Sequence, residues 1–348
     1  MKKNLMLLLL AMIAVFNLSA EPLMSVPVAT LNHNGQFTQY NGGNALIDAH
    51  NAAVSGDVIT LNNGIFNACT ITKGITLRGA CMGTTPEMQE QGMRPTIIQN
   101  EMHIQVPSTE TNTLKIEDLQ FYNRLYVDSV PHISFARVHA LTDSYTRASI
   151  NNFDAVQCMF YRIMAYNRTA ATVYSFVNST IAIGDGSTHY CPPHVYADHC
   201  VIGHCATIRG NENFYGDGQF KNCIFTYYKN PNMTGSCIPG GYSAQNCVAV
   251  NSGVFSLCND IECKEASLAT LFDDQEHTGY SDGNYINPLT EEAAATYLGT
   301  DGSQVGVYGG ILPFTMMPFN PIVTKCDIAG QTTQDGKLKV QIEVKSVW

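Results

Sequence analysis

The stretch FKNCIFTYY (residues 220–228) contains a motif that returns along the chain at nearly constant intervals. In this motif an aromatic residue is followed by a short polar stretch, then a cysteine and an aliphatic residue. Two further copies are YADHCVIGHC (196–205) and YSAQNCVAVN (242–251). Recurrence at one period predicts a structural unit that stacks on copies of itself.

Nine segments align on the position of Cys223, with spacings of 19 to 24 residues. The nine anchors are Leu77, Ile98, Leu119, Val138, Cys158, Ser179, Cys200, Cys223 and Cys247. Each anchor lies in a short run whose side chains alternate between two faces, as expected of a strand. Cys223 and Phe225 lie on one face, for example, and Ile224 lies on the other. One strand per unit of about 20 residues, without helical periodicity between the strands, predicts an all-β solenoid of parallel sheets.

The residue before the anchor is polar in seven successive units. These residues are Asp118, Arg137, Gln157, Asn178, His199, Asn222 and Asn246. We expect this column at a bend, where stacked Asn side chains hydrogen-bond along the axis.

The twelve cysteines of the chain divide between anchor and other positions. Those at anchors are expected to be buried thiols that act as small hydrophobic groups, although the spacing of rungs would also permit a bridge between neighbours. Among the others, Cys258 and Cys263 are the most local candidates for a disulfide.

Both ends of the solenoid are expected to be covered. Residues 44–54 predict a short N-terminal helix, and residues 337–345 alternate between apolar and charged side chains as a strand does. The outward residues after the anchor become apolar late in the series, at Val201, Ile224 and Val248. We therefore expect a C-terminal segment over that face.

The first 20 residues have the pattern of a cleaved secretory signal. Lys2 and Lys3 precede an apolar run over residues 5–16, which is shorter than the roughly 20 residues that cross a bilayer. Glu21 stands where a lipoprotein would have its lipid-modified cysteine. These features predict a secreted, periplasmic or surface protein that is not a lipoprotein.

The net charge and the distribution of apolar residues limit the classes of partner. The formal net charge is −10, and it becomes −12 once Lys2 and Lys3 are removed. This negative charge repels the phosphates of nucleic acid. No later run is apolar and long enough for a membrane span. We expect residues 21–313 to form the solenoid with its N-terminal cap and closing coil, and residues 314–348 to form a C-terminal β tail.

Several segments resemble a known family. The stretch ALIDAHNAAVSGDVITLNNGIFN with ITKGITLRGAC is similar to the opening coils of secreted right-handed parallel β-helix proteins of the pectate-lyase-like superfamily. The segments LFDDQEHTGYSDGNYINP and GTDGSQVGVYGGILPF are similar to their closing coil and exit. The resemblance implies a single-stranded right-handed parallel β-helix. Its members include lyases, hydrolases and binding proteins, so it does not fix an activity.

A basic and aromatic stripe is the main functional candidate. Arg147, Arg168, His189 and Arg209 follow the anchors by nine or ten residues on four consecutive rungs, with Tyr145 and Tyr166 stacked beside them. Guanidinium groups hold carboxylates bidentately and tyrosines offer faces for sugar rings, which suits an acidic polysaccharide. The alternative is a solvated face whose arginines pair with Asp143 and Asp185.

Other candidate sites have simpler interpretations. Asp185 and Asp217 could be paired catalytic carboxylates, but their Gly-flanked positions favour turns. Four histidines, at 189, 194, 199 and 204, could bind a metal, yet extended chain separates them by about 16 Å. We expect no cofactor, and no carboxylate cluster indicates Ca²⁺.

Three functions remain open at this point. The leading expectation is an exported glycan-binding protein without clear catalytic machinery. A polysaccharide lyase would use the same stripe for β-elimination, with an arginine neutralising the uronate and His189 or a tyrosine as base or acid. A structural or adhesion module would need neither.

Overall fold

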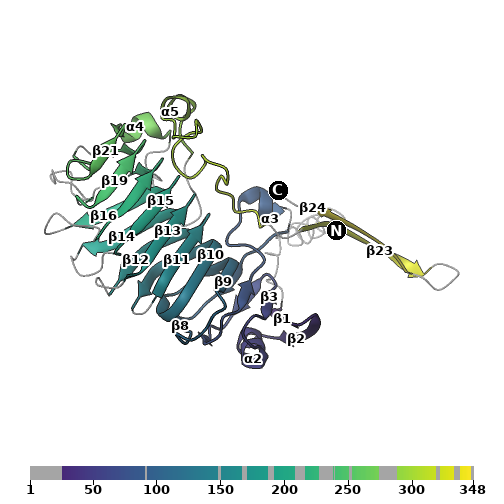
Figure 1. The fold of residues 1–348 in the computed structure, drawn as a ribbon. Coiled ribbons are helices and arrows are strands. Elements are labelled where there is room, and N and C mark those ends of the chain that lie inside the picture. The colour runs from purple at the N-terminus through teal and green to yellow at the C-terminus, as the bar shows by residue number, and fades with distance from the viewer. Residues whose placement is uncertain are drawn as a thin grey trace, which may run out of the picture.

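The structure, a computed structural model, describes part of the 348-residue chain. It covers residues 26–345 except 91, 148–149, 167–170, 187–191, 208–215, 227–237, 239, 251–252, 274–287, 319–321 and 333–337. Strands dominate, at 47% against 10% helix, and most of them form a right-handed parallel β-solenoid of about seven turns (Figure 1). The fold class predicted from the repeat is therefore confirmed.

Parallel strands stack in columns along the wall of the solenoid. The first column contains β3 (Val58–Leu61), β6 (Thr76–Arg78), β9 (Leu114–Phe121), β10 (Leu125–Thr146), β11 (Ile150–Val156), β13 (Val173–Val177), β15 (Val195–Asp198), β17 (Gly218–Lys221), β19 (Tyr242–Gln245) and β21 (Asn259–Ile261). The second contains β4 (Gly64–Phe66), β7 (Thr96–Ile98), the later parts of β9 and β10, then β12 (Met159–Ala165), β14 (Thr180–Gly186), β16 (Val201–Thr207), β18 (Ile224–Phe225), β20 (Val248–Ala249) and β22 (Lys264–Glu265). A short third column joins β5 (Thr70–Ile71), β8 (Met102–Gln105) and the start of β10.

The register of the second column confirms most of the predicted ladder. Val138 pairs with Leu119, and Val201 pairs with Ile224, which pairs with Val248. The residue before each of these last three is a cysteine, so Cys200, Cys223 and Cys247 stack. All three, together with Cys158, are thiols with fully buried side chains.

The first two anchors were wrong. Leu77 pairs with Ile116 in the first column, and Ile98 pairs with Phe121, two residues beyond the anchor Leu119. The cause is the irregular early turns, in which helix α3 (Pro86–Glu90) lies between β6 and β7 and lengthens the connection. The strict period therefore begins at Leu119.

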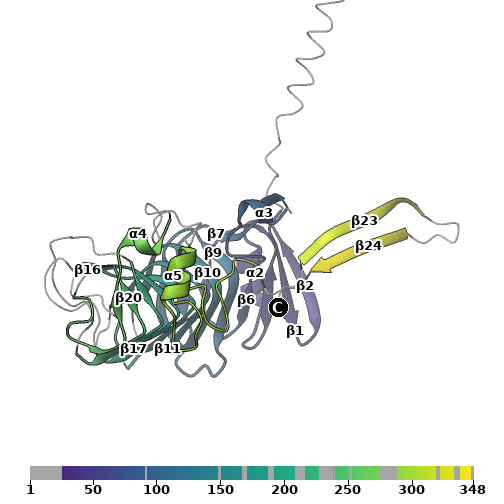
Figure 2. The ribbon, with the colours of Figure 1, turned by 90° about the horizontal axis from the view of Figure 1, so that it is seen from above.

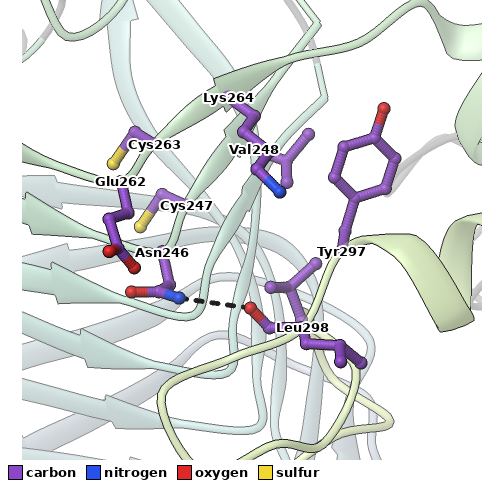
Figure 3. A pocket seen from close by; sticks show the side chains of 9 residues that line it. Asn246, Cys247, Val248, Glu262, Cys263, Lys264, Tyr297 and Leu298 are labelled. Atoms are coloured by element: carbon purple, nitrogen blue, oxygen red, sulfur yellow. Dashed lines mark hydrogen bonds between the residues drawn. The ribbon is translucent and has the colours of Figure 1, made fainter.

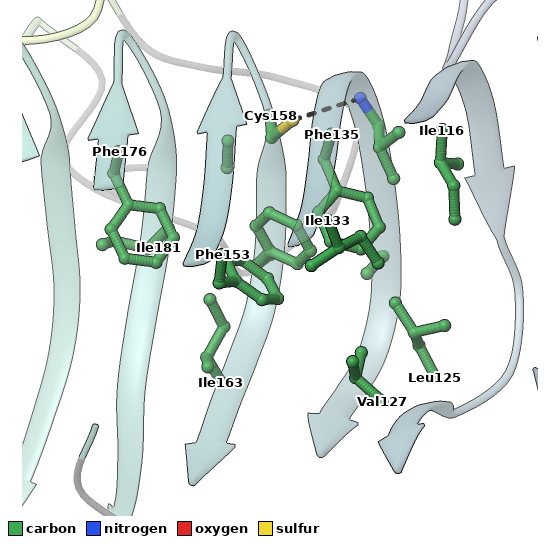
Figure 4. Close-up of a cluster of buried hydrophobic side chains, with 14 of the residues drawn as sticks. Ile116, Leu125, Val127, Ile133, Phe135, Phe153, Cys158, Ile163, Phe176 and Ile181 are labelled. Carbon is green, nitrogen blue, oxygen red and sulfur yellow. Dashed lines mark hydrogen bonds between the residues drawn. The ribbon is translucent and has the colours of Figure 1, made fainter. Parts of the chain in front are cut away.

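The interior is a continuous apolar column. Phe135, Phe153, Phe160 and Phe176 come from three successive turns and are almost completely buried. Their rings meet at centroid distances of 5.0–5.9 Å, most of them tilted or edge-on (Figure 4). Aromatic burial of this kind dominates core stabilisation.

The polar column predicted at a bend is confirmed. Asp118, Arg137, Gln157, Asn178, His199, Asn222 and Asn246 all have φ between 45° and 57°, and Glu262 continues the series. A left-handed residue between two strands turns the chain sharply, which Asn and Asp tolerate best. We call these eight residues the left-handed column.

The N-terminal end has a hairpin and a helix. β1 (Val28–His33) pairs antiparallel with β2 (Gln36–Asn41) and with β3. Helix α2 (Ala45–Ala52) packs against these three strands, close to the predicted range 44–54. Lys73 Nζ donates to the carbonyls of His50 (2.6 Å) and Ala53 (2.8 Å), so a cation stabilises the C-terminal end of the helix dipole.

A C-terminal segment covers the outside of the bend. After α4 (Leu268–Leu271) and α5 (Glu291–Thr296), residues 297–314 run back along the solenoid toward α3 (Figure 1); we call them the strap. Val305, Val307 and Phe314 of the strap belong to one buried cluster with Val201 and Ile224 of the wall. The predicted covering of this face is therefore confirmed.

The left-handed column is the seam to which the strap binds. The contacts are Asn246 Nδ2 to Leu298 O (3.3 Å), Asn222 Oδ1 to Thr300 N (2.8 Å), His199 Nε2 to Ser303 Oγ (3.1 Å), Asn178 Nδ2 to Val307 O (2.9 Å) and Gln157 Nε2 to Pro313 O (2.6 Å). The polar side chains thus hydrogen-bond mainly to the strap. Bonds along the axis occur between Arg137 and Asp118, and at Asn222, which donates to Asp198 at 2.9 Å.

The chain ends in an antiparallel hairpin. β23 (Ile322–Thr332) pairs with β24 (Leu338–Lys345), the strand predicted over 337–345. Figure 2 shows the hairpin extending away from the solenoid. Across the described residues, no helix has both the length and the apolar character needed to cross a membrane.

Candidate functional site

A row of stacked rings runs across successive turns, with His103 and Tyr126 at the starts of β8 and β10, Tyr145 near the end of β10 and Tyr166 directly after β12. His103 and Tyr126 have centroids 4.7 Å apart, Tyr126 and Tyr145 5.0 Å, and Tyr145 and Tyr166 5.6 Å. The first two distances match the spacing of strands in a sheet, about 4.8 Å, so equivalent positions on successive turns place the rings face to face. The predicted stacking of Tyr145 and Tyr166 is confirmed, with a tilt of 37°.

Two arginines flank this row. The Arg147 guanidinium carbon lies 4.2 Å from the centre of the Tyr126 ring and 5.8 Å from that of Tyr166, within cation–π range. Arg124 lies immediately before β10, two residues from Tyr126. We call His103, Arg124, Tyr126, Tyr145, Arg147 and Tyr166 the Tyr–Arg strip.

Both guanidinium groups remain accessible. The Arg124 and Arg147 side chains are 50% and 45% exposed, and their carboxylate contacts are long: 3.4 Å to Glu101 and 3.5 Å to Asp128. A guanidinium carries five N–H donors, so one long contact leaves capacity for a ligand.

Asp128 links several groups of the strip. It interacts with His103 Nδ1 at 2.8 Å, accepts a hydrogen bond from Gln105 Nε2 at 3.2 Å and forms an ion pair with Arg147 at 3.5 Å. The alternative interpretation of a solvated face paired the arginines with Asp143, but Asp143 binds Arg162 bidentately at 2.7 and 2.9 Å. The side chain of Asp185, the other expected partner, lies outside the described side chains.

The described part of the strip is nearly neutral. Its surroundings contain three guanidiniums, from Arg124, Arg147 and Arg162, and three carboxylates, from Glu101, Asp128 and Asp143. Binding of an acidic ligand therefore depends on the two loosely paired arginines rather than on a strong positive field.

Tyr145 is a hydrogen-bond donor and a poor base. Its hydroxyl donates to Asp143 Oδ2 at 3.1 Å. Burial, followed by the neighbouring Asp143 carboxylate, raises the pKa of Tyr145 to about 12. At neutral pH its phenolate is scarce, which disfavours proton abstraction by this side chain.

Three of the six predicted site residues lie together and three cannot be placed. Tyr145, Tyr166 and Arg147 belong to the strip, while Arg168, His189 and Arg209 lie outside the described residues. Their alignment with Arg147 stays a prediction. Tyr126 was missed, although it precedes Tyr145 by 19 residues, one period of the ladder.

The ring faces have a different use from the one expected. Tyr126 has His103 on one face and Tyr145 on the other, and Tyr145 lies between Tyr126 and Tyr166. These faces contact each other and are closed to sugar rings. A ligand would meet ring edges, hydroxyls and guanidiniums.

The other sequence candidates separate in space. Asp185 lies within β14 rather than in a turn, which corrects the expectation for that residue. Asp217 binds His194 Nδ1 at 2.7 Å, and His199 binds the strap. His189 lies outside the described residues, as does the side chain of His204.

The remaining candidates concern metals and disulfides. Among the residues that the structure describes, no group of three or more His, Cys, Asp or Glu could hold a metal ion. Cys258 and Cys263 are thiols and are not bridged.

Comparison with known proteins adds no relative. No model of a protein family, no curated protein and no solved structure matches this chain. The β-solenoid itself is the level of similarity that the structure supports.

Proposed function

We propose that this protein is exported and binds a linear acidic polysaccharide along the Tyr–Arg strip. The observation that carries the proposal is the row of rings at rung spacing, flanked by two half-exposed guanidiniums. A repeating surface suits a repeating ligand, because each turn of the solenoid offers the same contacts to the next unit of the chain.

The guanidiniums supply the charge recognition. Arg124 and Arg147 would each exchange one long carboxylate contact for a bidentate hydrogen bond to a carboxylate of the ligand. The cation–π contact between Arg147 and Tyr126 orients the N–H fork of Arg147, which lowers the entropy lost on binding.

Binding without cleavage fits the chemistry better than β-elimination. A lyase needs a base near the carbon beside the uronate carboxylate. Tyr145 has its pKa raised by burial and donates its proton to Asp143, so it does not fill that role.

Membership in the pectate-lyase-like superfamily and export through residues 1–20 are part of the same proposal. The right-handed solenoid and the opening segments support the former. The charge and apolar pattern of the first 20 residues supports the latter.

The test is titration calorimetry with a polyuronate and with a neutral polysaccharide of similar length. We expect the polyuronate to bind more tightly, and Arg147→Ala to weaken it by about tenfold, the effect of losing one charge-assisted contact. Arg78→Ala is the matched control, because Arg78 is an arginine of similar exposure paired with Glu117 outside the strip. Equal affinity of the wild type and Arg147→Ala would refute the proposed site.

A parallel assay separates binding from turnover. Incubation with the polyuronate, followed by absorbance of unsaturated products in the ultraviolet, should give no signal. Product formation that Tyr145→Phe abolishes would replace the binding function by a lyase.

A further inference from the structure

The column of stacked thiols ends in a pair with a distinct environment. Val248 pairs with Lys264, and Lys264 N donates to Cys247 O at 2.8 Å, so Cys263 lies one turn above Cys247. Figure 3 shows both sulfur atoms pointing to the same side of the wall. The Cys247 thiol donates to Gln245 O at 3.4 Å and the Cys263 thiol to Ile261 O at 3.8 Å, and the proximity of Cys247 raises the pKa of Cys263.

The distance between turns suits a covalent bond. Neighbouring parallel strands are about 4.8 Å apart, and disulfides join residues whose Cα atoms are 4.4–6.8 Å apart. Cys247 and Cys263 also line a cavity of about 330 Å³ between the last two turns and the start of the strap. Their side chains face the interior of the solenoid: Cys247 belongs to the buried apolar core, and Cys263 packs against that core.

The last pair differs from the pairs below it. Cys200 and Cys223 stack in the same column with fully buried side chains, whereas Cys263 is partly exposed. β21 and β22, which flank Cys263, consist of two or three exposed residues each. Few buried side chains of β21 and β22 therefore attach this turn to the turn before it, and a cross-link would stabilise it.

We propose that Cys247 and Cys263 are a cross-linking site at which a disulfide fixes the last turn of the solenoid to the turn before it. The inference rests on the proposed export, because disulfides persist in oxidising compartments. It does not depend on glycan binding.

The chemistry is thiol–disulfide exchange with a small disulfide, such as oxidised glutathione, or with the disulfide of an exported oxidoreductase. One protein thiolate attacks the oxidant and releases one thiol, and the second thiolate displaces the other. Two S–H bonds and the S–S bond of the oxidant are lost, and the Cys247–Cys263 bond and two oxidant thiols are formed. Two electrons pass from the protein to the oxidant.

The timing follows from burial. Desolvation raises the pKa of Cys247 well above its usual range, and contact with Cys247 and burial do the same for Cys263. Thiolates are scarce once the last turn has packed onto the solenoid. The thiol–disulfide exchange therefore takes place while that turn is folding.

Peptide mapping tests the pairing. The full chain is refolded in reduced and oxidised glutathione, remaining thiols are alkylated in denaturant, and the digest is analysed without reduction. We expect a peptide pair joined through Cys247 and Cys263, two mass units lighter than the sum of its reduced parts. Alkylation of both residues, or a bond between Cys258 and Cys263 or between Cys223 and Cys247, would overturn the proposal.

Thermal unfolding of matched variants tests the consequence. The bridge closes a loop of about 16 residues, and its loss should lower the melting temperature by about 4 °C. Reductant should lower the melting temperature of the wild type and leave that of Cys263→Ala unchanged.

Cys158→Ala is the control, because Cys158 occupies the same column between Val138 and Ser179, which carry no thiol. The response of this variant to reductant should equal that of the wild type. Equal responses of Cys263→Ala and wild type would also overturn the cross-link, whatever the glycan assay gives.

Discussion

Arg137 and Asp118 form a bidentate ion pair between adjacent residues of the left-handed column, with Nε–Oδ1 and Nη2–Oδ2 distances of 2.5 and 2.9 Å. Their side chains are 3% and 1% exposed. Removing either charge from water costs several kcal/mol, so each group is tolerated because the other is present. Both residues also have positive φ, at 50° and 57°, a conformation that costs most residues about 1–2 kcal/mol.

We expect Arg137→Asn to lower the free energy of unfolding by about 3–5 kcal/mol, because it leaves the Asp118 carboxylate buried and unpaired. Asn is chosen because it accommodates the left-handed backbone. The double variant Asp118→Asn with Arg137→Asn should lose less than the single variant, since no charge remains buried. Urea unfolding measures both, and a double variant less stable than Arg137→Asn would contradict this explanation.

A second prediction concerns the attachment of the strap at Asn178. The buried Asn178 Nδ2 donates to Val307 O at 2.9 Å and to Gly309 O at 2.7 Å. Asn178→Ala removes both hydrogen bonds and places an unfavourable residue at φ 45°, so we expect a loss of about 3 kcal/mol. Asn178→Gly keeps the backbone conformation and loses only the hydrogen bonds.

The difference between these two variants isolates the backbone term. Asn178→Gly should be about 1 kcal/mol more stable than Asn178→Ala in chemical denaturation. In both variants a protease should cleave the strap sooner than in the wild type. Equal stability of Ala and Gly at this position would mean that the left-handed conformation costs nothing here.

The left-handed column was predictable because each of its members precedes an inward anchor, and only a bend lets a polar residue recur there. Its partners were not predictable. Asn178 and Val307 are 129 residues apart, and no periodic pattern connects the strap to a particular rung. The apolar character of Val201 and Ile224 indicated that a segment covers this face, but not which residues hydrogen-bond to the column.

The same distinction holds for the Tyr–Arg strip. Tyr145 and Tyr166 each begin a short motif with an arginine two residues later, so their stacking followed from the period alone. The pairing of Arg147 with Asp128 rather than Asp143 depends on which side of the turn each carboxylate faces. The register of β10 to β12 shifts between Ala140 and Asp143 and places Asp143 opposite Arg162, an irregularity that the period does not predict.

A third prediction concerns the buried His139. Burial lowers the pKa of His139 to about 4, and Gln120 Nε2 lies 3.2 Å from its Nδ1, which fits a neutral ring that accepts from the amide. The unfolded chain binds a proton near pH 6.5 and the folded chain does not, so stability rises with pH between about 4 and 6.5 and falls on acidification. His139 should account for about 3 kcal/mol of this change.

Urea unfolding from pH 4 to 7 should show a flatter profile for His139→Leu than for the wild type. The control is His132→Leu on the same strand, where the side chain is exposed. An unchanged profile for His139→Leu would show that His139 is not the titrating group.

A fourth prediction concerns acid release of the strap. His199 lies between two carboxylates, 2.9 Å from Asp198 on the wall and 3.6 Å from Asp301 on the strap. Burial alone would raise the pKa of Asp301, but hydrogen bonds from Ser303 and the charge of His199 outweigh it and lower that pKa. A lowered folded pKa gives stability that is present above about pH 4 and is lost as the pH falls through the folded value.

Asp301→Asn should therefore lower the melting temperature at pH 6 and reduce its fall between pH 5 and pH 3. Glu90→Gln, a change of the same type at an exposed site away from the strap, should leave both unchanged. If Asp301→Asn keeps the full acid dependence, the strap is not held by this carboxylate.

The last prediction tests whether Arg147 is available to a ligand. Asp128 competes for Arg147 across a 3.5 Å contact, and the Arg147 side chain is 45% exposed. Asp128→Asn removes the competing charge but keeps the size of the side chain, so we expect polyuronate affinity to rise by about two- to fivefold, the worth of an exposed ion pair. Asp273→Asn changes the net charge equally at an exposed position outside the strip and should raise affinity less. Calorimetry at low and at physiological salt measures both, since the gain should shrink as salt screens the charges. An affinity that falls in Asp128→Asn would mean that Asp128 holds Arg147 in its binding geometry instead of competing for it.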